Sequence, residues 1–173
     1  MTPPSSDTAR TSTAPLLNDQ QAIERIFRHI DNDTTDLGDT IWREPVESYH
    51  SHERFEAEIA LLRRLPIPFC PSAALPEAGS FVARAAAGTP LLVARGADGV
   101  VRAFINACRH RGMQVASGTG CSKAFACPYH AWTYNLEGAL KGIPGRSGFA
   151  DLDPDRHGLA EVNAAEQGGI VYV

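Results

Sequence analysis

Residues 104–138 read FINACRHRGMQVASGTGCSKAFACPYHAWTYNLEG, and two short motifs in this stretch decide what the chain can be. A cysteine and a histidine occur together twice, as C-R-H at 108–110 and as C-P-Y-H at 127–130, with sixteen residues between them. Each motif follows a predicted strand. Two loops brought tip to tip would therefore present two thiolates and two imidazoles to one site.

Two cysteines and two histidines are the ligands of a [2Fe–2S] cluster in which imidazole replaces thiolate on one iron. Such a cluster is formally neutral when oxidised and gains one negative charge on reduction, which suits one-electron transfer. The same four side chains also satisfy tetrahedral zinc, so a structural zinc module is the alternative. Zinc fingers usually group cysteine with cysteine, and the mixed pairs here favour the cluster. Gly112, Gly118 and Gly120 are expected to permit tight turns near the inorganic sulfides.

The rest of the chain predicts a mainly β fold preceded by two helices. Apolar residues at helical spacing follow Asn18 or Asp19 as the N-cap, and a second helix is expected over about 51–65. Fourteen of the fifteen glycines lie at or after Gly79, where short strands begin. Short strands joined by turns indicate a small antiparallel sandwich or barrel. The predicted strands are 80–84, 91–95, 100–106, 123–126, 133–136, 139–141, 159–163 and 169–173.

Composition suggests three parts and excludes several classes of protein. We expect a disordered tail over 1–17, a helical extension over 18–78 and a β domain over 79–173. The formal charge of -4 gives no basic surface for nucleic acid. No apolar run exceeds four residues, whereas a membrane span needs about 20. Four cysteines and no signal sequence favour a reducing, cytoplasmic location.

From about Ser51 onward the sequence resembles the Rieske domain of ring-hydroxylating, Rieske-type non-haem iron oxygenases. The resemblance rests on the two motifs, on F-I-N-A at 104–107 and on G-I-P at 142–144. It implies a Rieske-type β fold with two cluster-binding loops. The implied ligands of the [2Fe–2S] cluster are Cys108 and Cys127 on the inner iron, and His110 and His130 on the outer iron.

The resemblance also separates this chain from the Rieske proteins of respiratory complexes. Those proteins carry an additional cysteine in each loop, where Met113 and Tyr129 stand here. They also follow the second histidine with Gly-Ser, whose hydroxyl donates to a sulfide, whereas this chain has Ala131-Trp132. Fewer hydrogen bonds to sulfur imply a lower reduction potential.

The resemblance implies an oxidoreductase, either a monooxygenase or a dioxygenase. The Rieske domain would accept electrons from a ferredoxin or flavin reductase, ultimately from NAD(P)H. It would pass them to a mononuclear Fe(II) in a C-terminal domain that is absent from this chain. The chain would then be the N-terminal portion of the large subunit, trimeric in full length and unable to hydroxylate by itself. A stand-alone Rieske ferredoxin is the alternative.

Several other residues receive ordinary interpretations. Trp132 is expected to pack beneath a cluster loop. Arg109 and Arg111 are expected either to guide an acidic electron donor or to form salt bridges within the protein. The segment 153–157, with two aspartates and a histidine, is expected to be a turn rather than an iron site.

Overall fold

The computed structural model describes residues 17–173, which fall into two compact units divided between Pro45 and Val46. The tail predicted for 1–17 lies outside the described residues except for Leu17. The predicted domain boundaries at 17/18 and 78/79 stay predictions. No helix in the described range is both long and apolar enough to cross a membrane.

The described part of the first unit contains one helix, α1 (Asp19–Asn32). Its start agrees with the sequence, because the Asn18 side chain accepts a hydrogen bond from the Gln21 N–H. The Gln21 side chain accepts one from the Asn18 N–H in return, which completes a capping box. The predicted apolar face is present, and all four of its members are more than half exposed. They are Ile23, Ile26, Phe27 and Ile30.

The second unit begins with η1 (Val46–Tyr49) and α2 (His52–Leu62). The Ser51 hydroxyl accepts a hydrogen bond from the Arg54 N–H and so caps the first turn of α2. The helix ends at Leu62, three residues before the predicted limit of 65 and four residues before Pro66. Proline cannot donate the backbone hydrogen bond that a longer helix would need.

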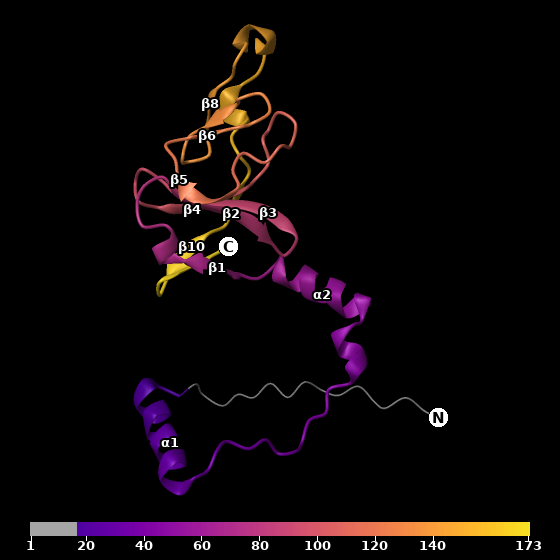
Figure 1. The fold of residues 1–173 in the computed structure, drawn as a ribbon, viewed down its shortest axis with the longest axis vertical. Helices are drawn as coiled ribbons and strands as arrows, with labels where there is room; N and C mark the ends of the chain where they lie inside the picture. Colours follow the sequence, from indigo (N-terminus) through magenta and orange to yellow (C-terminus); the bar gives the residue numbers. More distant parts are fainter. Residues whose placement is uncertain (1–16) are drawn as a thin grey trace, which may run out of the picture. The chain divides into compact units, whose positions relative to one another are not determined.

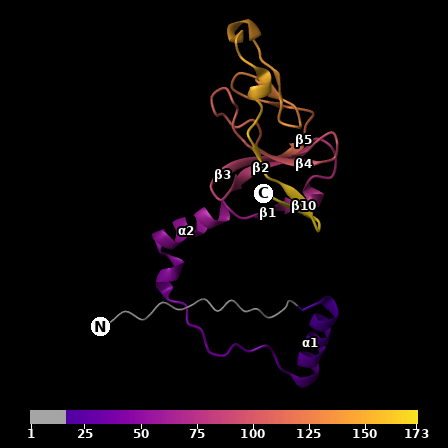
Figure 2. The same cartoon turned by 180° about the vertical axis from the view of Figure 1, so that it is seen from behind.

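Three antiparallel sheets form the body of the second unit, stacked one beyond another in Figures 1 and 2. The first has the order β1 (Pro68–Pro71), β11 (Ile170–Tyr172), β10 (Ala165–Gln167). The middle sheet has the order β5 (Gly118–Cys121), β2 (Ser80–Ala86), β3 (Thr89–Arg95), β4 (Val101–Ile105), β9 (Glu161–Val162). The third has the order β6 (Phe125–Ala126), β7 (Thr133–Tyr134), β8 (Leu140–Gly142). Three 3-10 turns connect strands: η2 (Ser72–Ala74), η3 (Arg146–Phe149) and η4 (Pro154–Arg156).

The mainly β class and the two helices are confirmed, and three strands are additional. Prolines bound β1, glycines make up half of β5, and every side chain of β10 is exposed. None of the three shows the alternation that predicts a strand. They are strands because β11 and β2 offer them free edges, with β1 and β10 on the two sides of β11.

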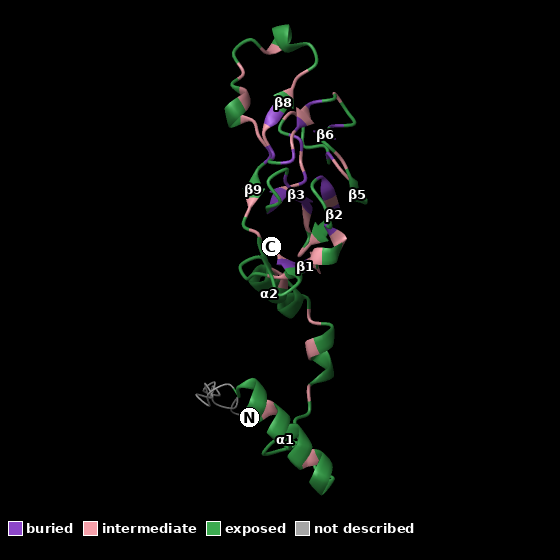
Figure 3. Cartoon of the chain, turned by 90° about the vertical axis from the view of Figure 1, so that its left-hand side faces the viewer, coloured by how far each residue is buried: buried purple, intermediate pink, exposed green. Residues whose placement is uncertain are grey.

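The centre of the middle sheet is buried on both faces, which gives the unit two cores. Along β3, Leu92 and Ala94 contribute to one core, whereas Leu91 and Val93 contribute to the other. Side chains of a strand alternate between faces, so the continuous run Leu-Leu-Val-Ala is what a doubly covered strand requires. Figure 3 shows the buried residues concentrated in the strands of this unit. The first core extends to the third sheet and contains both motif cysteines.

Candidate metal centre

The first motif forms a closed loop directly after β4. The Gly112 N–H donates to the Cys108 carbonyl at 2.8 Å, and the Cys108 N–H donates to the Met113 carbonyl at 2.7 Å. Gly112 has φ +75, a left-handed conformation that glycine adopts without a steric penalty. The loop thus turns back on itself around His110.

The second motif, between β6 and β7, closes in the same way. The Ala131 N–H donates to the Cys127 carbonyl, and the Cys127 N–H donates to the Trp132 carbonyl, both at 2.8 Å. Ala131 occupies the position of Gly112 and is also left-handed, with φ +55. The two loops are therefore built on one backbone pattern, with glycine at the turn in one and alanine in the other.

Two of the three glycines expected near the sulfides lie outside these loops. Gly118 and Gly120 belong to β5 at the edge of the middle sheet, so this prediction was wrong for both. Gly120 has no positive φ, and a Cβ there would lie 3.1 Å from the Phe81 ring. Close packing against that ring, rather than a cluster turn, explains the glycine at 120.

A buried asparagine fixes the base of the first loop. The Asn106 side chain is 2% exposed, and its Oδ1 accepts hydrogen bonds from the N–H groups of Val115 and Ala116. Its Nδ2 donates to the Ala116 carbonyl at 2.8 Å. These bonds satisfy backbone groups that the loop would otherwise bury unpaired. Asn106 lies in the F-I-N-A segment, but its bonding role was not apparent from sequence.

The structure brings the four motif residues together in a two-layer arrangement. Cys108 and Cys127 are 3% and 4% exposed and lie in one core. The rings of His110 and His130 are half-buried, with centroids 4.6 Å apart and planes inclined by 66°. The thiols thus lie inside the domain and the imidazoles lie nearer its surface.

Tyr134 adds a hydroxyl that sequence reasoning missed. Its oxygen lies 3.2 Å from the Cys108 Sγ and accepts a hydrogen bond from the Arg109 N–H at 2.9 Å. Burial, together with the Cys108 thiol, raises the pKa of Tyr134 above its usual value. The hydroxyl therefore keeps its proton and can donate it to the sulfur. Tyr134 stands four residues after His130, on β7, and only the fold directs it to Cys108.

The donor set fits a [2Fe–2S] cluster. The Nδ1 of His130 is buried and has no hydrogen-bond partner among residues 17–173, as expected of a nitrogen reserved for a metal. Partial burial, then the neighbouring His130 and Arg111, lower the pKa of His110, which favours the neutral ligand form. In the same range no three His, Cys, Asp or Glu side chains converge on one ion. Zinc needs four around one ion, whereas each iron of the cluster needs two.

Aromatic side chains support the histidines. The His110 ring stacks on Trp132, with centroids 4.9 Å apart and planes within 10°, and Phe149 contacts both rings edge-on. Trp132 is 2% exposed and packs beneath the loop, as expected. The segment 153–157 is a turn, also as expected, in which His157 Nδ1 bonds the Asp153 carbonyl.

The fold and its paired Cys–His loops define the class as a small β domain for an iron–sulfur cluster. The chain belongs to the Rieske [2Fe-2S] domain family, whose model matches residues 66–153. The resemblance drawn from the two motifs is therefore confirmed, and the cofactor of this family is the [2Fe–2S] cluster.

The relatives are oxygenase subunits. The chain is 35% identical over 134 residues to the carnitine monooxygenase oxygenase subunit of Escherichia coli K12, covering 76% of this chain and 36% of the relative. It is 37% identical over 108 residues to the anthranilate 1,2-dioxygenase large subunit of Burkholderia cepacia, covering 58% and 26%.

A solved structure shares the fold. It is a quaternary ammonium Rieske monooxygenase described in connection with carnitine oxidation by gut microbiota and inter-subunit electron transfer. The TM-score is 0.70 at 30% identity, over 78% of this chain and 37% of that one. The chain thus spans between about a quarter and somewhat more than a third of the length of these relatives.

Proposed function

We propose that Cys108 and Cys127 hold one iron of the [2Fe–2S] cluster and that His110 and His130 hold the other. The observation that carries this assignment is the two-layer arrangement. Two buried thiols lie in one core, and two half-buried imidazoles lie in ring contact. When bound, the cluster supplies one-electron transfer. With these ligands, the cysteine side of the cluster would face the interior and the histidine side would face the surface.

We further propose that the domain serves the large subunit of a Rieske non-haem iron oxygenase. It accepts electrons at the histidine side and passes them to a mononuclear Fe(II) in a catalytic domain outside this chain, for O₂-dependent hydroxylation. The relatives, which include both monooxygenase and dioxygenase subunits, support this function.

The proposed partners are a ferredoxin or flavin reductase as electron donor and further copies of the full-length subunit, assembled as a trimer in the cytoplasm. Arg109 and Arg111 support an acidic donor, because both are exposed and form no ion pair within residues 17–173. The description of inter-subunit electron transfer in a relative supports an assembly of subunits.

Anaerobic reconstitution with iron and sulfide tests the ligand assignment. Visible absorption and EPR after dithionite should show the low average g of a histidine-ligated cluster. His110→Ala and Cys127→Ala should abolish that signal. The matched controls, His157→Ala and Cys121→Ser, remove the same side-chain types outside the site and should retain it. A colourless protein with one zinc per chain would refute the assignment.

The coding sequence beyond Val173 tests the oxygenase function separately. A following domain with two histidines and a carboxylate for mononuclear iron would support it. A stop codon soon after Val173 would instead support a stand-alone Rieske ferredoxin, and it would leave the ligand assignment intact.

A further inference from the structure

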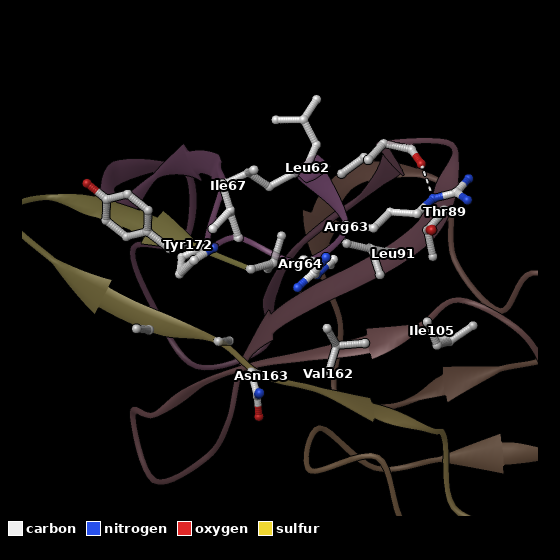
Figure 4. A pocket seen from close by; sticks show the side chains of 17 residues that line it. Leu62, Arg63, Arg64, Ile67, Thr89, Leu91, Ile105, Val162, Asn163 and Tyr172 are labelled. Atoms are coloured by element: carbon white, nitrogen blue, oxygen red, sulfur yellow. Dashed lines mark hydrogen bonds between the residues drawn. The ribbon is translucent and has the colours of Figure 1, made fainter. Parts of the chain in front are cut away.

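A pocket lies beside the core that contains Leu91 and Val93, on elements that carry none of the four motif residues. It is a pocket of about 480 Å³, bounded by the end of α2 and the segment after it, by the β2–β3 hairpin and by the last strand (Figure 4). Its floor is apolar, formed by Leu91, Ile105 and Val162. A volume of this size is typical of sites for small organic ligands.

The charged side chains of the lining are all positive. Arg63 and Arg64 are the only charged side chains among the 17 residues that line the pocket. Figure 4 shows the Arg64 guanidinium reaching over the middle of the pocket beside Leu91. No ion pair or hydrogen bond joins this guanidinium to any side chain in the described part of the chain. Its donors are free to bind a ligand.

Arg63 is held in place at the rim. Its Nε donates to the Ala87 carbonyl at 2.9 Å, so its two remaining nitrogens keep their donors. Both arginines lie at the C-terminal end of α2, where positive charge also stabilises the helix dipole. The dipole accounts for the presence of positive charge there, but it does not account for the apolar pocket beneath that charge.

We infer that this pocket binds a small carboxylic acid with an apolar body. The planar guanidinium fork matches the geometry of a carboxylate, and Arg64 offers that fork without a competing acidic side chain. The apolar part of the ligand then lies against Leu91 and covers Ile105 and Val162, which are half-buried and whose remaining surface it removes from water. A cation of the same size is repelled by the two arginines, and a neutral alcohol leaves their charge unpaired.

Octanoate is the probe, titrated into the 173-residue protein by calorimetry and followed by NMR chemical shifts of Leu91, Ile105 and Val162. Octylammonium and 1-octanol have the same chain length and separate the effect of charge from that of apolar contact. The charge-neutral variant is Arg64→Gln, and its matched control is Arg156→Gln, an exposed arginine of η4 outside the lining.

We expect saturable binding of octanoate with shifts confined to the pocket, and no binding of octylammonium. Losing a charge-assisted hydrogen bond should weaken octanoate about tenfold in Arg64→Gln and leave Arg156→Gln unchanged. Equal binding of all three probes would show an apolar patch without anion recognition and would overturn the inference. Absence of saturable octanoate binding, or equal affinity in Arg64→Gln, would overturn it as well.

Discussion

The phenolic oxygen of Tyr134 lies 3.2 Å from the Cys108 Sγ, across 26 residues of sequence. The Arg109 N–H donates to the same oxygen, and either the hydroxyl or the Cys108 thiol can donate in the contact between them. Toward a cysteine thiolate, which has no proton, only the Tyr134 hydroxyl can donate. This chain has Ala131-Trp132 where the Rieske proteins of respiratory complexes have Gly-Ser. The sequence therefore predicted few hydrogen bonds to the cluster sulfurs. Tyr134 supplies one such bond from a different strand.

Tyr134→Phe should therefore lower the reduction potential of the reconstituted protein. A hydrogen bond to a ligand sulfur stabilises the reduced, more negative state, and its loss corresponds to about 20–60 mV for one electron. Redox titration followed by EPR measures the shift. Tyr172→Phe removes a phenol in the first sheet and should leave the potential unchanged. An unchanged potential in Tyr134→Phe would show that the hydroxyl does not donate to Cys108.

Alanine substitutions at two hairpin glycines distinguish the cost of backbone strain from the cost of side-chain crowding. Gly99 (φ +78) and Gly138 (φ +83) both adopt left-handed conformations, but only at Gly138 would a Cβ meet a neighbour, 2.4 Å from the Phe104 Cε1. Phe104 is 1% exposed and lies in the core, so any movement of its ring disturbs core packing. Gly99→Ala should cost about 1 kcal/mol of stability, and Gly138→Ala about 2–4 kcal/mol. Urea denaturation compares them, and equal losses would mean that crowding contributes nothing.

Ala131 is a non-glycine residue at a left-handed position, where its loop counterpart is Gly112. Ala131→Gly should relieve the steric strain and raise the free energy of unfolding by about 0.5–1 kcal/mol. Ala126→Gly, in β6, has no such strain to relieve and should be destabilising. Thermal denaturation of the two variants measures both effects. A loss of stability in Ala131→Gly would contradict the strained geometry of this loop.

The ion pair between Arg95 and Glu166 should make stability depend on acid. The two side chains make two hydrogen bonds, at 2.8 and 3.0 Å, between β3 and β10. Hydrogen bonding to Arg95 lowers the pKa of Glu166 to about 2. Because the folded pKa is lower than the unfolded one, this contribution is present above about pH 4.5 and declines as pH falls toward 2.

Glu166→Gln tests that dependence. The stability difference between wild type and variant should be constant near neutral pH and shrink below about pH 4.5. Urea midpoints over that range measure it. The control is Glu77→Gln, because the Glu77 carboxylate forms no ion pair within residues 17–173. A difference independent of pH would show that the ion pair does not set the acid response.

Features written in a few adjacent residues could be read directly from the sequence. The Asn18 cap and the Asp-Gly and Glu-Gly hairpins are local patterns, and the structure agrees with each. The spacing of the two Cys–His motifs is a local pattern as well. The donor types alone limited the site to a mixed cluster or zinc. The domain boundaries and the ligand assignment stay predictions.

Contacts between distant segments were decided only by tertiary structure. The sequence of β1 reads as proline-rich extended chain and becomes a strand because β11, about a hundred residues later, offers it an edge. Tyr134 reads as an ordinary strand residue, and it reaches Cys108 because β7 and the loop after β4 share one core. Local sequence specifies turns, caps and donor chemistry, since these depend on neighbouring residues. The contact between the Tyr134 hydroxyl and the Cys108 Sγ and the pocket beneath Arg64 both depend on how remote strands pack. No short sequence pattern encodes that packing.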